Sequence, residues 1–115
     1  MDEMRKIIEK IKKFRDERDW LQFHDPKNMA ISIMLEASEL LEHFQWKTKA
    51  EVEEYIKKNS ESVQEEIADI AMYLFELADN LGIDLVSVME AKLKKNAAKY
   101  PVEKAKGSNK KYDQL

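Results

Sequence analysis

Apolar residues near the start of the chain recur at intervals of three and four positions, with charged residues between them. The positions are Met4, Ile7, Ile8, Ile11 and Phe14. Side chains with this spacing lie on one face of an α-helix. The pattern therefore predicts a first amphipathic helix that buries one stripe.

A second helix is predicted over about residues 26–46. The helical pattern breaks over residues 20–25, and Asp25 followed by a proline is typical of an N-cap with proline in the first turn. Residues 29–41 include no lysine or arginine, and most of them are apolar. Such a helix needs to be covered on several sides, which a short chain cannot easily do alone. We therefore expect a homo-oligomer.

Two further helix starts are predicted from hydroxyl residues followed three positions later by glutamate, the spacing of a capping box. Thr48 and Glu51 would open a short polar helix that ends near Asn59. Ser62 and Glu65 would open a third long helix.

The last long helix is predicted after Asp84, which can act as its N-cap. Its apolar stripe consists of Leu85, Val88, Met89 and Leu93. Gly82 would end the preceding helix, and Tyr100-Pro101 would stop the last one. A polar, lysine-rich tail follows at residues 102–115. With no strand pattern and no internal repeat, the expected fold is all-α, a four-helix-type bundle.

Composition agrees with a single helical domain over residues 1–115. Charged residues make up 37% and apolar residues 43%, a balance typical of helices with one wet face. The net charge of −3 argues against nucleic acid as the main partner, and the absence of cysteine excludes disulfides and thiolate zinc sites. No apolar run is long enough for a membrane span, and residues 1–13 are too charged for a signal peptide. We therefore expect a cytoplasmic protein.

Two pairs of carboxylates have the spacing of neighbours on one helix face. Glu36 and Glu39 interrupt the apolar second helix, and Glu66 and Asp69 lie three apart on the third. If the two helices pack antiparallel, the four groups meet and would repel one another without a cation. All-oxygen ligation suits magnesium, with manganese as a substitute. The alternative is that these are ordinary solvated acids, which the Glu66 pair taken alone would favour.

A di-iron carboxylate bundle is a rival metal site. That class pairs its glutamates with Glu-x-x-His. The chain has only His24 and His43, and neither follows a glutamate at that distance. Redox di-iron chemistry is therefore not expected.

Several strings in the chain resemble one known family. The order Glu36-x-x-Glu39 and then Glu66-x-x-Asp69 is similar to the signature of the MazG-like, all-α nucleoside triphosphate pyrophosphohydrolases. Longer strings resemble the dCTP pyrophosphatase branch of that family: FRDERDWLQFHDPKN at 14–28, FQWK at 44–47, EEIADIAMYL at 65–74 and KYPVEKAKGSNKKYDQL at 99–115.

The resemblance implies a homotetramer or dimer of dimers that cleaves nucleoside triphosphates between the α and β phosphates. Magnesium would be bound by the four carboxylates. The residues that match substrate-binding positions of the branch are Trp20, Trp46, Tyr73, Asn96 and Lys99.

Other candidate residues also have structural alternatives. Asn96 could be an interface amide, and His24 could bond a ligand or cap a loop. Lys110 and Lys111 could fold over a triphosphate or remain solvated. Aromatic residues at helix ends are usually core packing, and on that basis Phe23 and Phe44 are assigned to the core. His43 is expected to be a solvated residue of the second helix.

The expected reaction is attack of water on the α-phosphorus, with pyrophosphate leaving. Magnesium would bridge phosphate oxygens and activate the water, and Glu36 or Glu39 would act as general base. Two alternatives stay open: a related pyrophosphohydrolase that acts on another nucleotide, and a non-enzymatic helical oligomerisation module.

Overall fold

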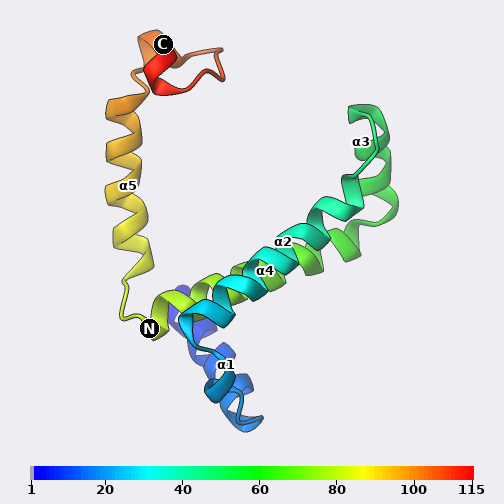
Figure 1. Cartoon of the computed structure of the whole chain (residues 1–115), viewed down its shortest axis with the longest axis vertical. Helices are drawn as coiled ribbons and strands as arrows, with labels where there is room; N and C mark the ends of the chain where they lie inside the picture. Colours follow the sequence, from blue (N-terminus) through cyan, green and yellow to red (C-terminus); the bar gives the residue numbers. More distant parts are fainter. Residues whose placement is uncertain (1) are drawn as a thin grey trace. The chain divides into compact units, whose positions relative to one another are not determined.

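Helices carry most of the chain in the computed structural model, which describes residues 2–115, and no strand forms within them (Figure 1). The elements in chain order are α1 (Glu3–Glu17), η1 (Leu21–Phe23), α2 (Pro26–Phe44), α3 (Lys49–Lys58), α4 (Ser60–Asn80), α5 (Leu85–Lys99), α6 (Val102–Ala105) and η2 (Tyr112–Gln114). The predicted all-α class is confirmed. Of the helices in this described part, none is both long and apolar enough to cross a membrane.

Side-chain caps begin α2 and α3 where the sequence predicts them. Asp25 accepts a hydrogen bond from the backbone N–H of Asn28 at 2.9 Å. Thr48 and Glu51 form both bonds of the capping box, at 3.2 and 3.0 Å. Each cap satisfies N–H groups that have no partner within the helix.

The capping box predicted at Ser62 is wrong. The α4 helix begins at Ser60. Asn59 is both the C-cap of α3 and the N-cap of α4. The backbone N–H of Val63 already bonds to the Asn59 carbonyl at 3.2 Å. Since Ser62 lies inside the first helical turn, it lacks the non-helical backbone that an N-cap needs.

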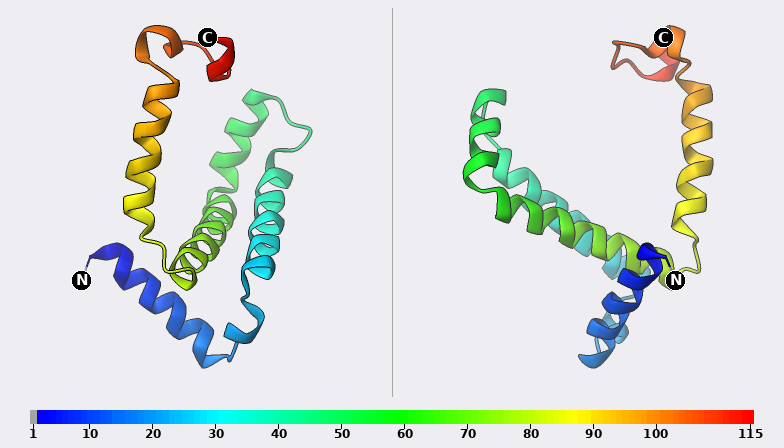
Figure 2. Two further views of the ribbon diagram at one scale, coloured as in Figure 1. Left: turned by 60° about the vertical axis from the view of Figure 1, so that its left-hand side comes forward. Right: turned by 180° about the vertical axis from the view of Figure 1, so that it is seen from behind.

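The chain divides into two compact units, one ending at Leu81 and the other covering Gly82–Leu115. In the first unit α2 and α4 lie side by side and antiparallel, with α3 at one end of the pair and α1 across the other (Figures 1 and 2). The buried apolar side chains of this unit are few: Ile8, Met29, Val63 and Ala78.

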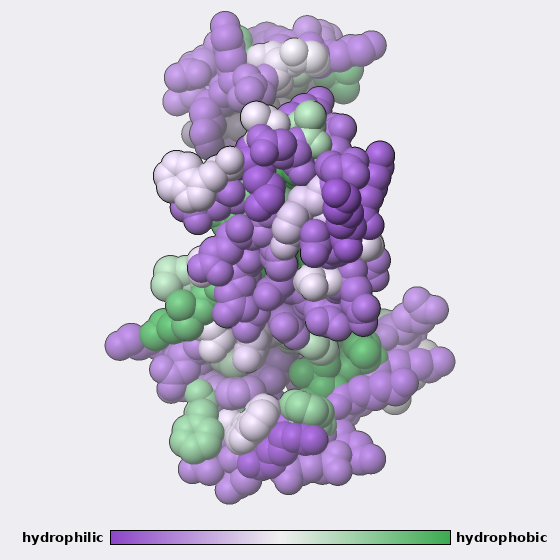
Figure 3. All heavy atoms as spheres, turned by 90° about the vertical axis from the view of Figure 1, so that its right-hand side faces the viewer, coloured by the Kyte–Doolittle hydropathy of each residue, from purple (hydrophilic) through white to green (hydrophobic). Residues whose placement is uncertain are grey.

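Within the first unit, much of the apolar surface of α2 and α4 is uncovered. Met34 and Leu41 are each 62% exposed, and Ile67 is 53% exposed. Figure 3 shows apolar side chains reaching the surface between hydrophilic ones on the face it displays. The core of the first unit is therefore small for two helices of this apolar content.

Two assignments of individual residues are wrong. Phe23 is 58% exposed and does not belong to the core of the first unit. His43, expected to be solvated, is partly buried, and its Nδ1 lies 2.5 Å from the Tyr55 hydroxyl. The reason is α3, which folds back against the end of α2 and covers His43 and Phe44.

The second unit contains α5, α6 and η2. Asp84 caps α5 by accepting a hydrogen bond from the backbone N–H of Ser87 at 3.3 Å, as predicted. The polar tail is not extended: Tyr112 packs edge-on against Tyr100, with ring centroids 6.1 Å apart, and the Lys99 ammonium lies 4.8 Å from the Tyr112 ring centroid. The joining of α5 to the other helices as a four-helix bundle, and the single domain over residues 1–115, stay predictions.

Candidate active site

Three carboxylates from α2 and α4 gather in one place. One oxygen from each of Glu36, Glu39 and Glu66 can be chosen so that all lie within 4.8 Å of one another. The antiparallel packing of the two helices brings these acids together, because residues three apart share a helix face. Asp69, the fourth predicted ligand, is outside this group but lies near enough for its charge to raise the pKa of Glu36.

Burial and crowding make this cluster costly without a cation. Burial, followed by the proximity of Glu66 and Glu39, raises the pKa of Glu36 to about 7. The Oε2 atoms of Glu36 and Glu66 are buried and have no hydrogen-bond partner within residues 2–115. Unpaired buried acceptors are expensive. Oxygen donors in this arrangement fit a hard divalent cation.

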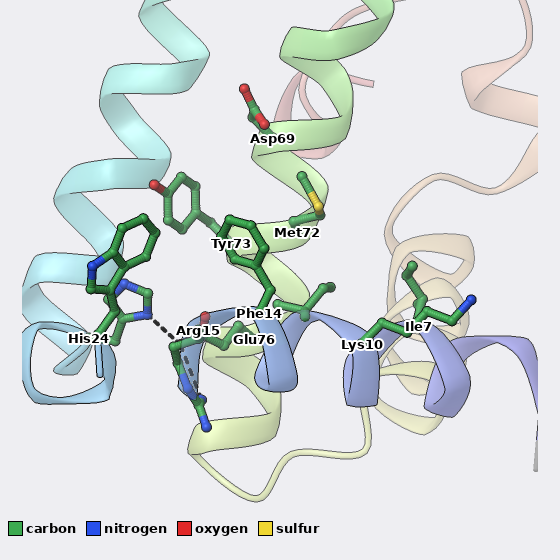
Figure 4. Close-up of a pocket in the computed structure, with 11 residues that line it drawn as sticks. Ile7, Lys10, Phe14, Arg15, His24, Asp69, Met72, Tyr73 and Glu76 are labelled. Carbon is green, nitrogen blue, oxygen red and sulfur yellow. Dashed lines mark hydrogen bonds and ion pairs between the residues drawn. The ribbon is translucent and has the colours of Figure 1, made fainter. Parts of the chain in front are cut away.

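A pocket of about 390 Å³ lies beside the acids, between α1 and α4 (Figure 4). Its volume is in the range of small-molecule sites. Aromatic and aliphatic side chains line most of it, together with a few polar groups. The lining residues are Ile7, Lys10, Ile11, Phe14, Arg15, Trp20, His24, Asp69, Met72, Tyr73 and Glu76. Asp69 lines the pocket, and its charge also raises the pKa of Glu36. The pocket and the acid cluster are therefore neighbours.

One end of the pocket is built from a buried polar network. Glu76 is 3% exposed and Arg15 is 5% exposed. The Glu76 Oε2 atom lies 2.7 Å from His24 Nδ1, 3.1 Å from Asn80 Nδ2 and 3.4 Å from Arg15 Nη1. The charges of Arg15 and Glu76 offset each other in an apolar surrounding.

Three predicted substrate-binding residues line this pocket: Trp20, His24 and Tyr73. Trp20 packs edge-on against Phe14, with ring centroids 5.8 Å apart. Burial raises the pKa of the Tyr73 phenol, as do the nearby charges of Glu36 and Asp69, so its hydroxyl stays a neutral donor. We find these side chains on the wall of one cavity, where a flat ring could stack.

Trp46 is not among the residues that line the pocket, and it is 93% exposed. It follows α2 in a turn whose closing bond runs from the Lys47 N–H to the Phe44 carbonyl at 3.2 Å. Gln45 has φ −59° and ψ 138°, and Trp46 has φ +66°. These angles belong to a type II turn, which favours glycine at the position that Trp46 occupies.

The remaining predicted residues lie in the second unit. Asn96 and Lys99 belong to the last turns of α5, and Lys110 and Lys111 precede η2. Within that unit Lys99 contacts the ring of Tyr112. The roles of these four residues at the substrate stay predictions.

Sequence reasoning missed Arg15 and Glu76. Arg15 lies in a charge-rich stretch, so nothing distinguishes it from solvated neighbours. Glu76 offers one clue, because it is the only charged residue within the apolar run 70–78. A lone charge in such a run predicts a buried partner, but the sequence does not name that partner.

Comparisons with known proteins agree on one family. A family profile described as the MazG-like family matches residues 31–115. The dCTP pyrophosphatase 1 of Rattus norvegicus is 39% identical over 104 residues, and that of Homo sapiens is 38% identical. Both alignments cover 89% of the chain but 61% of the relative, so the chain spans less than two thirds of the length of these relatives.

A solved structure is also similar over nearly its full length. It is a pyrophosphatase from Archaeoglobus fulgidus, 40% identical in sequence, with a TM-score of 0.84. The match covers 88% of this chain and 94% of that one.

Proposed function

Since the chain belongs to the MazG-like family, as its motifs predict, we propose that it hydrolyses nucleoside triphosphates to a monophosphate and pyrophosphate. Cytosine deoxynucleotides are the first candidate substrates, because two similar proteins are dCTP pyrophosphatases. The observation that carries the proposal is the junction of an acid cluster and an aromatic pocket at Asp69.

The residues of this junction follow one stripe of α4. Glu66, Asp69, Tyr73 and Glu76 are spaced by three and four positions, so they share a helix face. Ten residues of helix rise about 15 Å, which is long enough to separate phosphates at one end from a base at the other. The triphosphate lies at the Glu66 end and the base lies in the pocket toward Glu76.

The chemistry follows from this placement. A water oxygen forms a bond to the α-phosphorus, the bond from that phosphorus to the bridging oxygen breaks, and pyrophosphate leaves with that oxygen. Glu36, Glu39, Glu66 and Asp69 would hold magnesium, which offsets charge on the phosphates and lowers the pKa of bound water when present. Glu36 or Glu39 accepts the proton of the attacking water.

The experiment is a panel of nucleoside triphosphates assayed with magnesium in ¹⁸O-labelled water. We expect pyrophosphate as product, with the label in the nucleoside monophosphate, because attack is at the α-phosphorus. Label in the pyrophosphate would place the attack elsewhere. Release of orthophosphate alone, or no turnover of any nucleotide, would contradict the proposal. Glu39→Gln should abolish turnover, whereas the matched change at Glu42, an exposed residue one turn further along α2 and outside the acid cluster, should not.

We also propose that the chain assembles as a homotetramer or dimer of dimers. The exposed apolar side chains of α2 and α4 support this assembly, because their burial between copies would remove them from water. Trp46 supports it too. The 19 residues of α2 separate Trp46 from the pocket of its own chain by roughly 28 Å, so its indole could contact the base in such a pocket only in another copy.

The backbone at Trp46 favours a functional role for this side chain. A non-glycine residue at positive φ is strained, and an exposed indole gains nothing from packing within the chain. Contact with a base or a second copy would compensate for both costs. The role of Trp46 as a substrate-binding residue follows from this assembly.

A further inference from the structure

We propose that Glu76 is a positioning residue that fixes the tautomer of His24, so that the pocket presents a hydrogen-bond acceptor and prefers bases carrying an amino group. This inference deepens the proposed function and rests on it for the identity of the ligand. The tautomer itself is a property of the protein alone.

The geometry of the network defines which atom carries each hydrogen. The Arg15 guanidinium has only donors and the Glu76 carboxylate only acceptors. Asn80 bonds to both: its Oδ1 accepts from Arg15 Nη1 at 3.1 Å, and its Nδ2 donates to Glu76 Oε2 at 3.1 Å. Every assignment is consistent with an ionised Glu76 whose counter-charge is Arg15.

His24 completes this network through Nδ1, 2.7 Å from Glu76 Oε2 (Figure 4). A carboxylate cannot donate, so Nδ1 must carry a hydrogen and donate it. Arg15 also pairs with Asp16, at 2.8 Å, but the Asp16 side chain is 54% exposed and water screens its charge. Arg15 is therefore the buried counter-charge of Glu76, and the network does not need a second cation at His24. In the neutral imidazole Nε2 then has a lone pair and no hydrogen.

The Nε2 atom remains available to a ligand. This atom makes no hydrogen bond with any residue of the described chain. The buried side-chain atoms without a partner are Oε2 of Glu36 and Oε2 of Glu66, and His24 Nε2 is not among them. His24 lines the pocket and packs edge-on against Tyr73, with ring centroids 6.5 Å apart. An acceptor on this wall pairs with an N–H donor of a base, such as the exocyclic amino group of cytosine, and opposes the carbonyl that uracil has there.

The first test reads the tautomer directly. Nitrogen-15 NMR of the full chain at about pH 8, where an ordinary imidazole is neutral, distinguishes a protonated Nδ1 from a protonated Nε2. The chain has two histidines, so the variant His43→Gln assigns the signals. We expect His24 with hydrogen on Nδ1. Hydrogen on Nε2 in the wild-type protein would overturn the proposal, whatever the enzyme does to nucleotides.

Two variants separate positioning from simple structural support. Glu76→Gln keeps a carbonyl oxygen that can accept from Nδ1, and Arg15 keeps Asp16, 2.8 Å from its Nε. The Glu76→Gln variant should therefore keep the hydrogen on Nδ1 of His24. The double change Arg15→Met with Glu76→Leu removes both charges at similar volume, which buried ion pairs often tolerate. In this variant His24 should change to the Nε2-protonated form.

The second test measures binding of dCMP and dUMP to the metal-free protein by titration calorimetry, so that it does not depend on hydrolysis. Wild type and Glu76→Gln should favour dCMP. In the double variant the ratio of the two dissociation constants should fall about tenfold, the 1.4 kcal/mol scale of one hydrogen bond. An unchanged ratio in a folded double variant would contradict the proposal, as would equal binding of the two nucleotides by wild type. Absence of catalysis with this preference intact would contradict the proposed function alone.

Discussion

The proton on Glu36 is a property of the folded chain. Its pKa is raised from 4.5 to about 7, so the folded state binds this proton more tightly than the unfolded state. The resulting stabilisation is fully present below the unfolded pKa of 4.5 and is lost as the pH rises through about 7. Magnesium acts in the opposite direction, since it needs the ionised carboxylate.

We therefore predict that Glu36→Gln stabilises the metal-free protein relative to wild type by an amount that grows from about pH 5 to about pH 8. Urea unfolding at a series of pH values in chelator measures this difference. With magnesium at high pH the wild-type protein should be more stable than the Glu36→Gln variant, because only wild type can bind the ion with all of its carboxylates. A difference that does not depend on pH would show that Glu36 is ionised throughout.

Glu76 should matter for stability as well as for His24. Glu76→Ala leaves Arg15 buried beside a cavity, and removal of one partner of a buried ion pair costs about 3–5 kcal/mol. The double change Arg15→Met with Glu76→Leu should cost much less. Urea unfolding of both variants tests this, and a larger loss in the double variant would mean that the network stabilises the fold outright.

The two halves of the site differed in how well they could be predicted. Glu36 and Glu39 stand out because carboxylates interrupt an apolar helix, and antiparallel packing then brings Glu66 to them. The contact of Glu76 with Arg15 joins residues 61 positions apart. Helical periodicity reports which face a residue occupies but not which distant side chain it meets, so this network was missed.

At the scale of helices, the two candidate capping boxes offer a matched comparison. Thr48→Ala removes a bond that the structure forms, and should cost about 1 kcal/mol. Ser62→Ala changes an exposed residue inside the first turn of α4 and should be nearly neutral. Thermal unfolding of the two variants measures both. Equal losses would mean that the caps do not contribute as described.

The existence of every long helix was predictable, because α1 and α5 have apolar stripes of helical spacing, α2 is apolar on several sides, and a capping motif lies near the start of α4. The start of α4 was not, because α3 and α4 meet at the single residue Asn59 with no separating loop. A capping motif in sequence indicates only that a start is possible there. Whether the preceding helix leaves room for one depends on backbone geometry that local residue types do not encode.

At the scale of the whole molecule, the exposed apolar surface predicts assembly. Light scattering should give a mass near four times 13.6 kDa, or at least twice that value. Met34→Glu with Leu41→Glu places charges on two side chains that are each 62% exposed, and should yield smaller species that remain helical. The control Lys13→Glu changes an exposed charge on α1. A monomeric wild-type protein at micromolar concentration would contradict the assembly.

Sequence pattern did not determine how α5 and the tail relate to the first unit. The apolar stripe of α5 predicts that this helix packs against another apolar surface, but the stripe is equally well covered by the same chain or by another copy. The same ambiguity applies to α2. It explains why the helices could be predicted and their arrangement could not.

In the turn at Trp46, a substitution that raises thermal stability should lower activity. Glycine there would relieve the positive φ and should raise the stability of the isolated chain by about 1 kcal/mol. Directed evolution for thermal tolerance alone would enrich Trp46→Gly, and a library sorted by turnover would discard it. Deep mutational scanning under the two selections should therefore rank glycine and tryptophan at this position in opposite orders. Glycine depleted in both pools would mean that the indole contributes to the fold.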